Sequence, residues 1–452
     1  MIRWLGIHYK FPPVATVSSR RLYLLYKALS ELTEEQVVVT SAEAAKRPTE
    51  AAFFHNFRLS QVGGRGIREW LYGAKHNVVP SAHKQRPGYD ALVRLRETSP
   101  FDHWLGEGGP TYKKLAYRRA AQLVEQERIT HLFSSFRPWV DHQVAAKLKQ
   151  RYPHLHWIAD FRDLPMDPLR SPPYGLERHK RLLKDRLAYV DELWTVSEGL
   201  ADQFKRYHDR VKVVYGGLDE LPKANSWQSD RFTINYSGSI YPDLQVVSPL
   251  LACLERLTEQ GRVDPEQILI RYAGRDRQLF ADQLSKTDLP IKTELNDTVS
   301  MEKAKGFQQQ THINLLLSWS TETYRGVLTA KLYDYLAAGR PILALVNGPD
   351  DPELKAIIEG SESGKVFFGS MRNSEGNGSG HLLRPGESLR PAEVYKEKNV
   401  RPDNNSATLD EWLLKLYDDW SANNGALSWK PKPEMLKHLQ PLPILERLLR
   451  PN

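Results

Sequence analysis

The sequence predicts an α/β protein of two domains, each built on a parallel β-sheet whose strands are joined by helices. Apolar runs of strand length alternate with helical patterns along most of the chain, as in parallel sheets with crossover helices. A polar, turn-rich run at 217–230 divides this alternation into two series. At 452 residues the chain is also longer than one hydrophobic core usually supports.

The N-terminal domain is expected over residues 1–216. Its strands are expected near 2–8, 36–40, 130–135, 156–161, 191–196 and 211–215. The helix after the first strand presents four leucines on one face, namely Leu22, Leu25, Leu29 and Leu32. Ser18 or Ser19 is expected to cap it. The irregular stretch 41–111 predicts an insertion that forms part of a binding surface.

The C-terminal domain is expected over residues 231–408. Its strands are expected at 232–236, 268–272, 291–295, 313–318, 342–346 and 365–368. Asp351 followed by Pro352 predicts a helix start, with the carboxylate as N-cap. A long loop rich in Gly, Ser, Asn and Pro is expected at 369–407. The helical region 409–452 is expected to pack back on the N-terminal domain.

Composition excludes several classes of protein. No apolar run approaches the ~20 residues that span a bilayer, and the start of the chain lacks the pattern of a secretory signal. We therefore expect a cytoplasmic protein. The single cysteine, Cys253, cannot form an internal disulfide or a cysteine-cluster metal site, and its apolar surroundings predict an inert core thiol.

The net charge of +8 is concentrated in one segment. Residues 46–128 hold 15 Lys and Arg against 8 Asp and Glu, together with the aromatic residues Trp70, Tyr72, Phe101 and Trp104. This mixture is compatible with anionic lipid headgroups, a polyphosphate substrate or nucleic acid. A solvated basic face is the simpler interpretation.

Two glycine turns follow predicted strands of the C-terminal domain, where open parallel sheets bind their ligands. At the first, Gly238 leaves room for backbone amides to approach a diphosphate, and Ser239 adds a hydroxyl. At the second, Gly274 permits close approach and Arg275 can meet a phosphate. A plain tight turn and an ordinary exposed arginine are the structural alternatives.

The segment 325–343 is the strongest candidate. It predicts a loop, a helix capped by Thr329 and ended by Gly339, and a buried strand. Lys331 lies in the first turn, where a cation opposes the helix dipole, so an anion such as a diphosphate is expected to compensate it. Asp334, at i+3, can accept both hydroxyls of a ribose. The alternative is an intrahelical pair between Lys331 and Asp334 on a solvated face.

Polar residues also follow two strands of the N-terminal domain. Asp160, Arg162 and Asp163 form either an ion pair that braces a turn or a polar group that faces the cleft between the domains. Ser135 ends the preceding strand, and His142 lies on the next helix as a candidate general base. A structural role for this histidine is the alternative.

Taken together, these segments resemble the retaining glycosyltransferases of family 4, whose GT-B architecture consists of two Rossmann-like domains facing each other across a cleft. Segments that carry the resemblance occur in the family's order: Phe11-Pro12-Pro13, Ser18-Ser19-Arg20-Arg21, Ser134-Ser135, Asp160-Phe161-Arg162-Asp163, Val196-Ser197-Glu198, Tyr236-Ser237-Gly238-Ser239-Ile240-Tyr241 and Thr329 to Leu343. The stretch from Lys331 to Pro341 is the most specific of them.

The resemblance implies a nucleotide-sugar donor held by the C-terminal domain. The donor-binding residues it implies are Gly238, Ser239, Gly274, Leu328, Thr329, Lys331 and Asp334, and the catalytic group it implies is Lys331 with Arg275 or Arg325 beside the diphosphate. The chain departs from the family at Gly326, which occupies the first acidic position of the paired-glutamate motif. Glu322 lies nearby, but the spacing does not establish it as a substitute.

The implied reaction transfers a sugar, with retention of configuration and without metal or cofactor, to a hydroxyl of a glycan or lipid-linked acceptor. Ser135, His142 and Asp163 are the expected acceptor-side residues. We expect a role in cell-surface polysaccharide or glycoconjugate synthesis, with peripheral contact at the inner face of an anionic membrane. Nucleic-acid binding is the least favoured option. Two alternatives stay open: a non-catalytic sugar-nucleotide-binding or scaffold protein, for which Gly326 is an argument, and a sugar-nucleotide epimerase of similar architecture, which would act without an acceptor.

Overall fold

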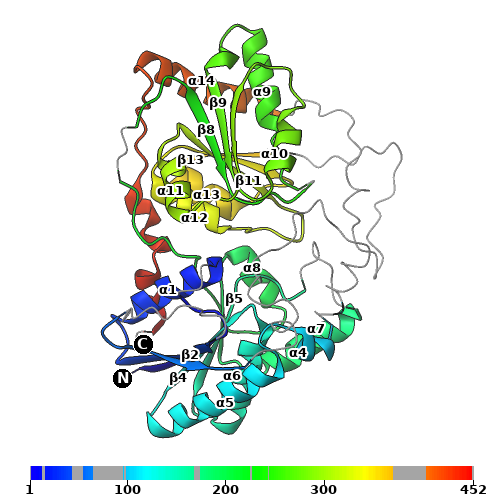
Figure 1. The fold of residues 1–452 in the computed structure, drawn as a ribbon, viewed down its shortest axis with the longest axis vertical. Coiled ribbons are helices and arrows are strands. Elements are labelled where there is room, and N and C mark those ends of the chain that lie inside the picture. Colours follow the sequence, from blue (N-terminus) through cyan, green and yellow to red (C-terminus); the bar gives the residue numbers. More distant parts are fainter. Residues whose placement is uncertain are drawn as a thin grey trace. The chain divides into compact units, whose positions relative to one another are not determined.

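The chain forms two compact α/β units in the computed structural model (Figure 1). The structure describes residues 2–12, 16–42, 54–64, 95, 98–166, 174–223, 227–242, 244–369 and 404–449. The first unit comprises the chain up to Gly217 and the segment that begins at Leu439, and the second comprises most of the remainder. Much of the predicted insertion at 41–111 and most of the loop predicted at 369–407 lie outside the described residues.

The sheet of the first unit is parallel throughout, in the order β3-β2-β1-β4-β5-β6-β7. Its strands are β1 (Arg3–His8), β2 (Glu35–Ser41), β3 (Phe57–Val62), β4 (His131–Phe136), β5 (His156–Phe161), β6 (Glu192–Thr195) and β7 (Val211–Val213). The six strands predicted for this region are confirmed. The edge strand β3 falls in the predicted insertion and was not predicted, because its half-exposed residues lack a continuous apolar run.

Helices cover this sheet: α1 (Val17–Leu29), α4 (Phe101–Leu105), α5 (Gly109–Gln126), α6 (Trp139–Arg151), α7 (Leu176–Leu187), α8 (Glu198–Phe204) and the C-terminal α15 (Pro441–Leu449), which packs on α1. The predicted cap of α1 was wrong: Thr16 is the N-cap, and its hydroxyl accepts from the Ser19 amide. Thr16 has an extended backbone, whereas Ser18 and Ser19 already lie inside the helix.

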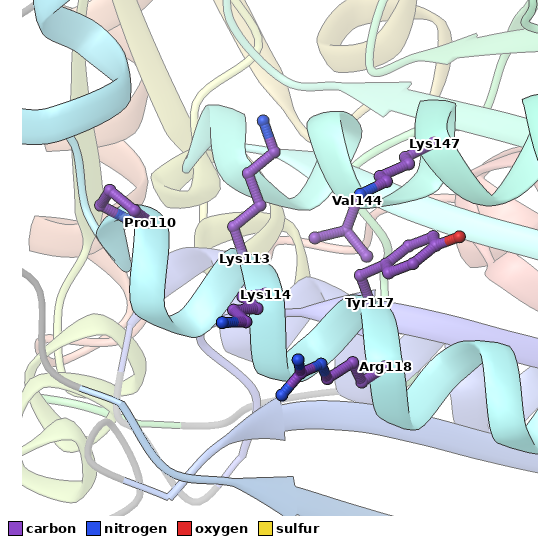
Figure 2. Close-up of a pocket in the computed structure, with 7 residues that line it drawn as sticks. All are labelled: Pro110, Lys113, Lys114, Tyr117, Arg118, Val144 and Lys147. Atoms are coloured by element: carbon purple, nitrogen blue, oxygen red, sulfur yellow. The ribbon is translucent and has the colours of Figure 1, made fainter.

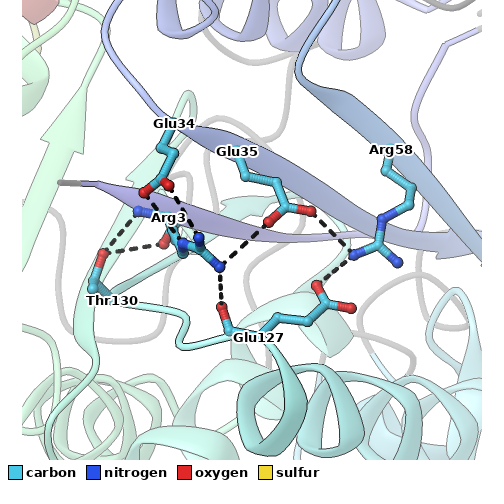
Figure 3. Close-up of polar contacts among 6 residues, drawn as sticks. All are labelled: Arg3, Glu34, Glu35, Arg58, Glu127 and Thr130. Carbon is cyan, nitrogen blue, oxygen red and sulfur yellow. Dashed lines mark hydrogen bonds and ion pairs between the residues drawn. The ribbon is translucent and has the colours of Figure 1, made fainter.

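Paired charges join the first three strands near their amino-terminal ends (Figure 3). The Arg3 guanidinium lies 3.0 Å from a Glu34 carboxylate oxygen and 3.8 Å from one of Glu35. Arg58 on β3 pairs in turn with Glu35, at 3.4 Å, and with Glu127. Each cation of this network therefore has a carboxylate partner.

The second unit contains the parallel sheet β10-β9-β8-β11-β12-β13. Its strands are β8 (Phe232–Ser237), β9 (Ile268–Ala273), β10 (Lys292–Asn296), β11 (Ile313–Trp319), β12 (Ile342–Asn347) and β13 (Gly364–Gly369), which confirm the predicted series. Its α-helices are α9 (Ser248–Glu259), α10 (Arg277–Leu284), α11 (Met301–Gln309), α12 (Ala330–Ala338), α13 (Pro352–Gly360) and α14 (Asn404–Ala422). Buried Cys253 lies in its core.

The C-terminal region divides between the two units. Helix α14 packs against α9 in the second unit, where Arg256 and Asp410 form an ion pair at 2.6 Å. The expectation that all of 409–452 packs on the N-terminal domain therefore needs correction, because only the segment from Leu439 onward belongs to the first unit. The apolar face of α14, which includes Leu413 and Trp420, completes the core of the second unit instead.

The six strands of the second sheet follow the order of the first six strands of the first sheet, and the direction of winding reverses beside the first strand of each unit. In the second unit this switch point lies between β8 and β11. Open parallel sheets bind ligands at the carboxyl ends of the strands beside such a point. None of the described helices is long and apolar enough to span a bilayer.

Candidate functional site

The loops at the carboxyl ends of β8, β9 and β11 contain the donor-site residues predicted in the second unit. Strand β8 ends at Ser237 and continues into Gly238 and Ser239, and β9 continues into Gly274 and Arg275. A connection of ten residues joins β11 to α12 and provides Arg325, Gly326, Leu328 and Thr329.

Lys331 is fixed against the loop that follows β8. Its ammonium donates a hydrogen bond to the Tyr236 hydroxyl and another, of 2.7 Å, to the carbonyl of Ser239. The same ammonium lies 4.5 Å from the centroid of the Tyr236 ring. The intrahelical pair with Asp334 is not observed, because the Lys331 side chain reaches β8 instead. Asp334 is half-buried on α12.

The two glycine turns make room for this lysine and for each other. Gly238 has φ of 128°, and a Cβ there would lie 2.4 Å from Cε of Lys331. A Cβ on Gly274 would lie 2.3 Å from the Gly238 carbonyl oxygen. Both positions therefore require glycine, although the space at Gly238 is filled by the lysine and not by open solvent.

The Lys331 ammonium is held without a carboxylate in contact. Burial is the main cause that lowers its pKa to about 7; the charge of Arg275 lowers it further, and that of Asp276 raises it. Among the described residues no Asp or Glu lies within ion-pair distance of its Nζ, which is bonded only to neutral oxygens. An arriving anion would restore the charged form of this lysine.

Polar atoms without a partner lie along the β11–α12 connection. Thr329 occupies the N-cap position of α12, as predicted, but its side chain makes no capping hydrogen bond. Its Oγ1, the Oγ of Ser318 and the Nε of Arg325 are buried and have no hydrogen-bond partner within the described part of the chain. The first amides of a helix also lack intrahelical partners, so this end of α12 offers several donors to a ligand.

Gly326, at the position where the family has its first acidic residue, is anchored by a carboxylate from another loop. Its amide donates a 2.8 Å hydrogen bond to Oδ2 of Asp351, and it has φ of 72°. The other oxygen of Asp351 accepts from Leu354, which confirms the predicted N-cap of α13. Asp351 therefore positions the connection between β11 and α12, a role that the sequence pattern did not indicate.

The two candidate arginines are in different surroundings. Arg275 is partly exposed beside the buried Asp276, at 3.4 Å, and its charge acts on Lys331. Arg325 pairs at 3.1 Å with the exposed Glu322. Leu328 is half-buried, and its amide donates to the Gly326 carbonyl at 2.9 Å.

The corresponding edge of the first unit is closed by a buried ion pair. Asp160 and Arg21 lie 2.8 Å apart, with side chains that are 0% and 4% exposed respectively. Asp160 also accepts a 2.6 Å hydrogen bond from Ser135. Burial alone would raise the pKa of Asp160, but the Arg21 guanidinium holds it below its ordinary value.

Within the described residues, neither His142 nor Asp163 makes a hydrogen bond or ion pair with Arg21 or Asp160. His142 is buried and its Nδ1 lies 2.7 Å from the Ser134 hydroxyl; burial lowers its pKa to about 3, which makes it a weak base at neutral pH. Arg162 donates two hydrogen bonds to the Phe136 carbonyl, so the bracing ion pair of Asp160 with Arg162 is replaced by the pair with Arg21. Asp163 is half-buried.

The geometry of the second unit is thus suited to an anion. A cation without a carboxylate, a helix start without a side-chain cap and several unpartnered donors occur at one sheet edge. Sequence reasoning found Lys331, Thr329 and the two glycines, but it gave no role to the Tyr236 hydroxyl. A tyrosine at the end of a buried strand, one residue before a polar loop, is the signal that was available.

No family model matches the chain, and no curated protein matches its sequence. Solved structures do resemble it. One described as trehalose-6-phosphate from E. coli bound with UDP-2-fluoro glucose has a TM-score of 0.51 at 12% identity, over 99% of this chain and 98% of that one. Also similar are WaaG, a glycosyltransferase involved in lipopolysaccharide biosynthesis (TM-score 0.46, 12% identity, 99% and 100% covered), and the spinosyn rhamnosyltransferase SpnG (0.41, 12%, 99% and 100%). The first likeness and the two parallel sheets confirm the predicted fold, two Rossmann-like α/β domains in one chain.

Proposed function

We propose that the chain is a glycosyltransferase whose second unit binds a nucleotide-sugar donor. The observation that carries this proposal is the Lys331 ammonium, which is fixed by Tyr236 and Ser239 at the start of α12 and has no carboxylate partner among the described residues. Holding a cation in this way costs free energy, and a diphosphate is the ligand that both the helix amides and the lysine favour.

In this proposal the diphosphate accepts hydrogen bonds from the amides of Ser239 and the first turn of α12, and from Lys331. The Gly238 amide already donates to the Ala273 carbonyl at 2.8 Å, so Gly238 contributes space and not a donor. Arg275 provides a second positive charge, and Asp334 accepts from the ribose hydroxyls. Because charge builds up on the diphosphate as the glycosidic bond to it breaks, these fixed donors stabilise the transition state more than the ground state. The acceptor oxygen attacks the anomeric carbon on the face that the diphosphate leaves, and its proton passes to the departing diphosphate. Configuration is therefore retained, as in family 4, and neither a metal nor a protein nucleophile is required.

The acceptor is proposed to be a hydroxyl of a glycan or a lipid-linked intermediate, bound by the first unit. Of the three predicted acceptor-side residues, Asp163 is half-buried, whereas Ser135 and His142 are buried and hydrogen-bonded. We therefore propose that Asp163 contacts the acceptor and that the other two support it. Peripheral attachment to an anionic membrane and a role in cell-surface polysaccharide synthesis belong to the same proposal.

Calorimetry with a panel of UDP-, GDP- and dTDP-sugars tests the donor site, followed by assays of nucleoside diphosphate release with candidate acceptors. We expect one donor to bind, and Lys331→Met to weaken its binding by roughly 10-fold to 100-fold, since hydrogen bonds to charged groups contribute about 1.5–3 kcal/mol. The matched control is Lys355→Met, which removes an exposed lysine from α13 and should leave binding unchanged.

Lys331→Met should also leave the free energy of unfolding within about 1 kcal/mol of wild type, because replacing a desolvated charge by an apolar side chain is often neutral. A loss of donor binding would then report on the site and not on the fold. Equal donor affinity in Lys331→Met and wild type, or no binding to any donor of the panel, would contradict the proposal.

A second candidate function is a non-catalytic sugar-nucleotide-binding subunit. Gly326 favours it, because its amide is occupied by Asp351 and the position has no side chain to contact the donor sugar. Donor binding with no release of nucleoside diphosphate under any acceptor condition would select this function over transfer. Restoring a carboxylate by Gly326→Glu is not a clean test, since φ of 72° strains any side chain there.

A further inference from the structure

Two cavities open on the helical surface of the first unit, in contact with α5 and α6. The smaller has a volume of about 330 Å³ and the larger about 520 Å³. Lys113 of α5 and Lys147 of α6 line both of them, so the two cavities adjoin. Volumes of this size are typical of small-molecule sites.

The smaller cavity is lined mainly by cations, with no acidic side chain (Figure 2). Its lining residues are Pro110, Lys113, Lys114, Tyr117, Arg118, Val144 and Lys147. Within the described ranges, none of the four cations lies within ion-pair distance of a carboxylate. This contrasts with the amino-terminal ends of the same sheet, where Arg3 and Arg58 are paired with glutamates.

Two of the cations are held in defined positions. The Lys113 ammonium donates a 2.9 Å hydrogen bond to the Gln143 side chain, and that of Lys147 lies 4.3 Å from the centroid of the Tyr117 ring. Burial, with the charges of Arg186 and Lys147, lowers the pKa of Lys113. The acidic group that opposes this shift, Asp102, is itself paired with Arg186 at 3.4 Å.

The larger cavity adds aromatic rings and hydrogen-bonding atoms. Trp139, His142 and Trp157 contribute to its lining. Nε1 of Trp139 and Nε2 of His142 are buried and have no hydrogen-bond partner among the residues that the structure describes. Gln143 and Gln150 also line this cavity, as does the ion pair of Asp102 with Arg186. Hydroxyl groups of a ligand would satisfy such atoms, whereas an apolar ligand would leave them without partners.

We propose that these adjoining cavities form a second anion site, which binds a phosphate ester with its phosphate in the smaller cavity and its hydroxylated remainder in the larger. Four cations that have no carboxylate within ion-pair distance among the described residues repel one another, and a phosphate relieves this repulsion while accepting several hydrogen bonds. A soluble polyol phosphate and the headgroup of a glycerophospholipid present the same chemistry. The inference does not depend on the donor site of the second unit.

The test uses the full-length protein with glycerol 3-phosphate, glycerol and inorganic phosphate in calorimetry, and with vesicles of phosphatidylglycerol or phosphatidylcholine in co-sedimentation. A triple variant, Lys114→Gln with Arg118→Gln and Lys147→Gln, removes three exposed cations that line the smaller cavity. The matched control, Lys205→Gln with Arg206→Gln and Arg210→Gln, removes the same charge from exposed positions after α8.

We expect glycerol 3-phosphate to bind and glycerol not to bind, with affinity that falls as salt is raised. The triple variant should bind at least about 10-fold more weakly than the control. Trp139→Phe, which replaces the indole by a smaller ring without an N–H, should weaken glycerol 3-phosphate about fivefold and leave inorganic phosphate unchanged. If both glycerol 3-phosphate and phosphatidylglycerol vesicles bind, the result supports a soluble polyol phosphate as the ligand. If only the vesicles bind, it supports a lipid headgroup.

Two results would overturn the inference. One is that neither glycerol 3-phosphate nor the anionic vesicles bind. The other is an equal loss in the triple variant and its control, which would show that overall charge, and not this cavity, attracts the ligand. Donor binding by the second unit would be unaffected in both cases, so failure here is distinct from failure of the proposed function.

Discussion

The two units share the order of their first six strands but differ in what they place at the carboxyl edge of the sheet. In the first unit, Arg21, Asp160 and Ser135 fill the edge with a buried, charge-balanced group, in which Nε of Arg21 lacks a hydrogen-bond partner among the described residues. In the second, Lys331 is held at the corresponding edge with only neutral oxygens as partners, near unpartnered Thr329 Oγ1. The same scaffold therefore carries a paired buried cation in one unit and, among the described residues, a cation without an ion-pair partner in the other.

This difference separates charges that hold the fold from charges that await a ligand. A buried ion pair is destabilising to break, because one charge is left without its partner. A desolvated cation that has no counter-charge opposes folding, and such groups are concentrated at functional sites. By this criterion the first unit's edge is structural, and a ligand-binding role is proposed for the second unit's edge.

The largest expected effect is a loss of stability when the buried ion pair of the first unit is broken. Asp160→Asn leaves the Arg21 guanidinium buried without a charge partner, and we expect it to lower the free energy of unfolding by about 3–5 kcal/mol. Urea unfolding measures this change. Arg58→Gln, which removes an exposed guanidinium from the network of Figure 3, is the comparison and should cost less than about 1 kcal/mol.

If Asp160→Asn fails to fold, the paired replacement Arg21→Met with Asp160→Leu still tests the idea. It removes both charges together and should recover most of the stability. A small loss in Asp160→Asn, similar to that in Arg58→Gln, would show that the cluster is not a structural ion pair. The distinction between the two edges would then have to be abandoned.

The fold was predictable because its signals are local. Buried parallel strands such as β8 and β11 are continuous apolar runs, and Asp351 with Pro352 marks a helix start. Edge strand β3 was missed because its residues are half-exposed and its pattern is irregular. The sequence did not predict that α14 packs in the second unit. Its apolar face predicts burial but does not specify which unit provides the partner surface.

The candidate site was predictable only in part. Lys331 is conspicuous because a cation in the first turn opposes the helix dipole, so the sequence indicated an anion. Its contact with Tyr236, and the carboxylate of Asp351 beneath Gly326, join residues far apart in the chain. No spacing rule connects such positions. The contact that closes the first unit's edge, Arg21 with Asp160, was hidden for the same reason.

The pKa of Lys331 predicts an effect of intermediate size, namely a change of donor affinity with pH. The charged ammonium is the form that binds a diphosphate, and its pKa in the free protein is about 7. Donor affinity should therefore be constant well below pH 7 and should fall above it, by up to about tenfold per pH unit until the raised pKa of the bound state is reached. Calorimetry with the nucleotide sugar, whose diphosphate does not titrate near neutrality, measures this profile.

Lys331→Met provides the control for that profile, because its weaker binding should not change over the same pH range. Proton uptake on binding by the wild type, measured in buffers of different ionisation enthalpy, should disappear in the variant. A wild-type affinity that stays constant between pH 6 and pH 9 would place the ammonium outside the diphosphate site.

The smallest expected effect is on donor affinity, and it distinguishes Arg275 from Arg325. The charge of Arg275 acts on Lys331, while Arg325 is paired with an exposed glutamate in the adjoining loop. Arg275→Gln should weaken the donor about fivefold, as expected for a partly screened charge near a phosphate, and Arg325→Gln should change it by less than twofold. Calorimetry under one salt condition gives both values. The reverse order would move the diphosphate towards the β11–α12 connection, where the Arg325 Nε is buried without a partner among the described residues. The edge of the second unit would then be completed by Arg325 and the amides of α12, with Lys331 serving mainly to hold the β8 loop in place.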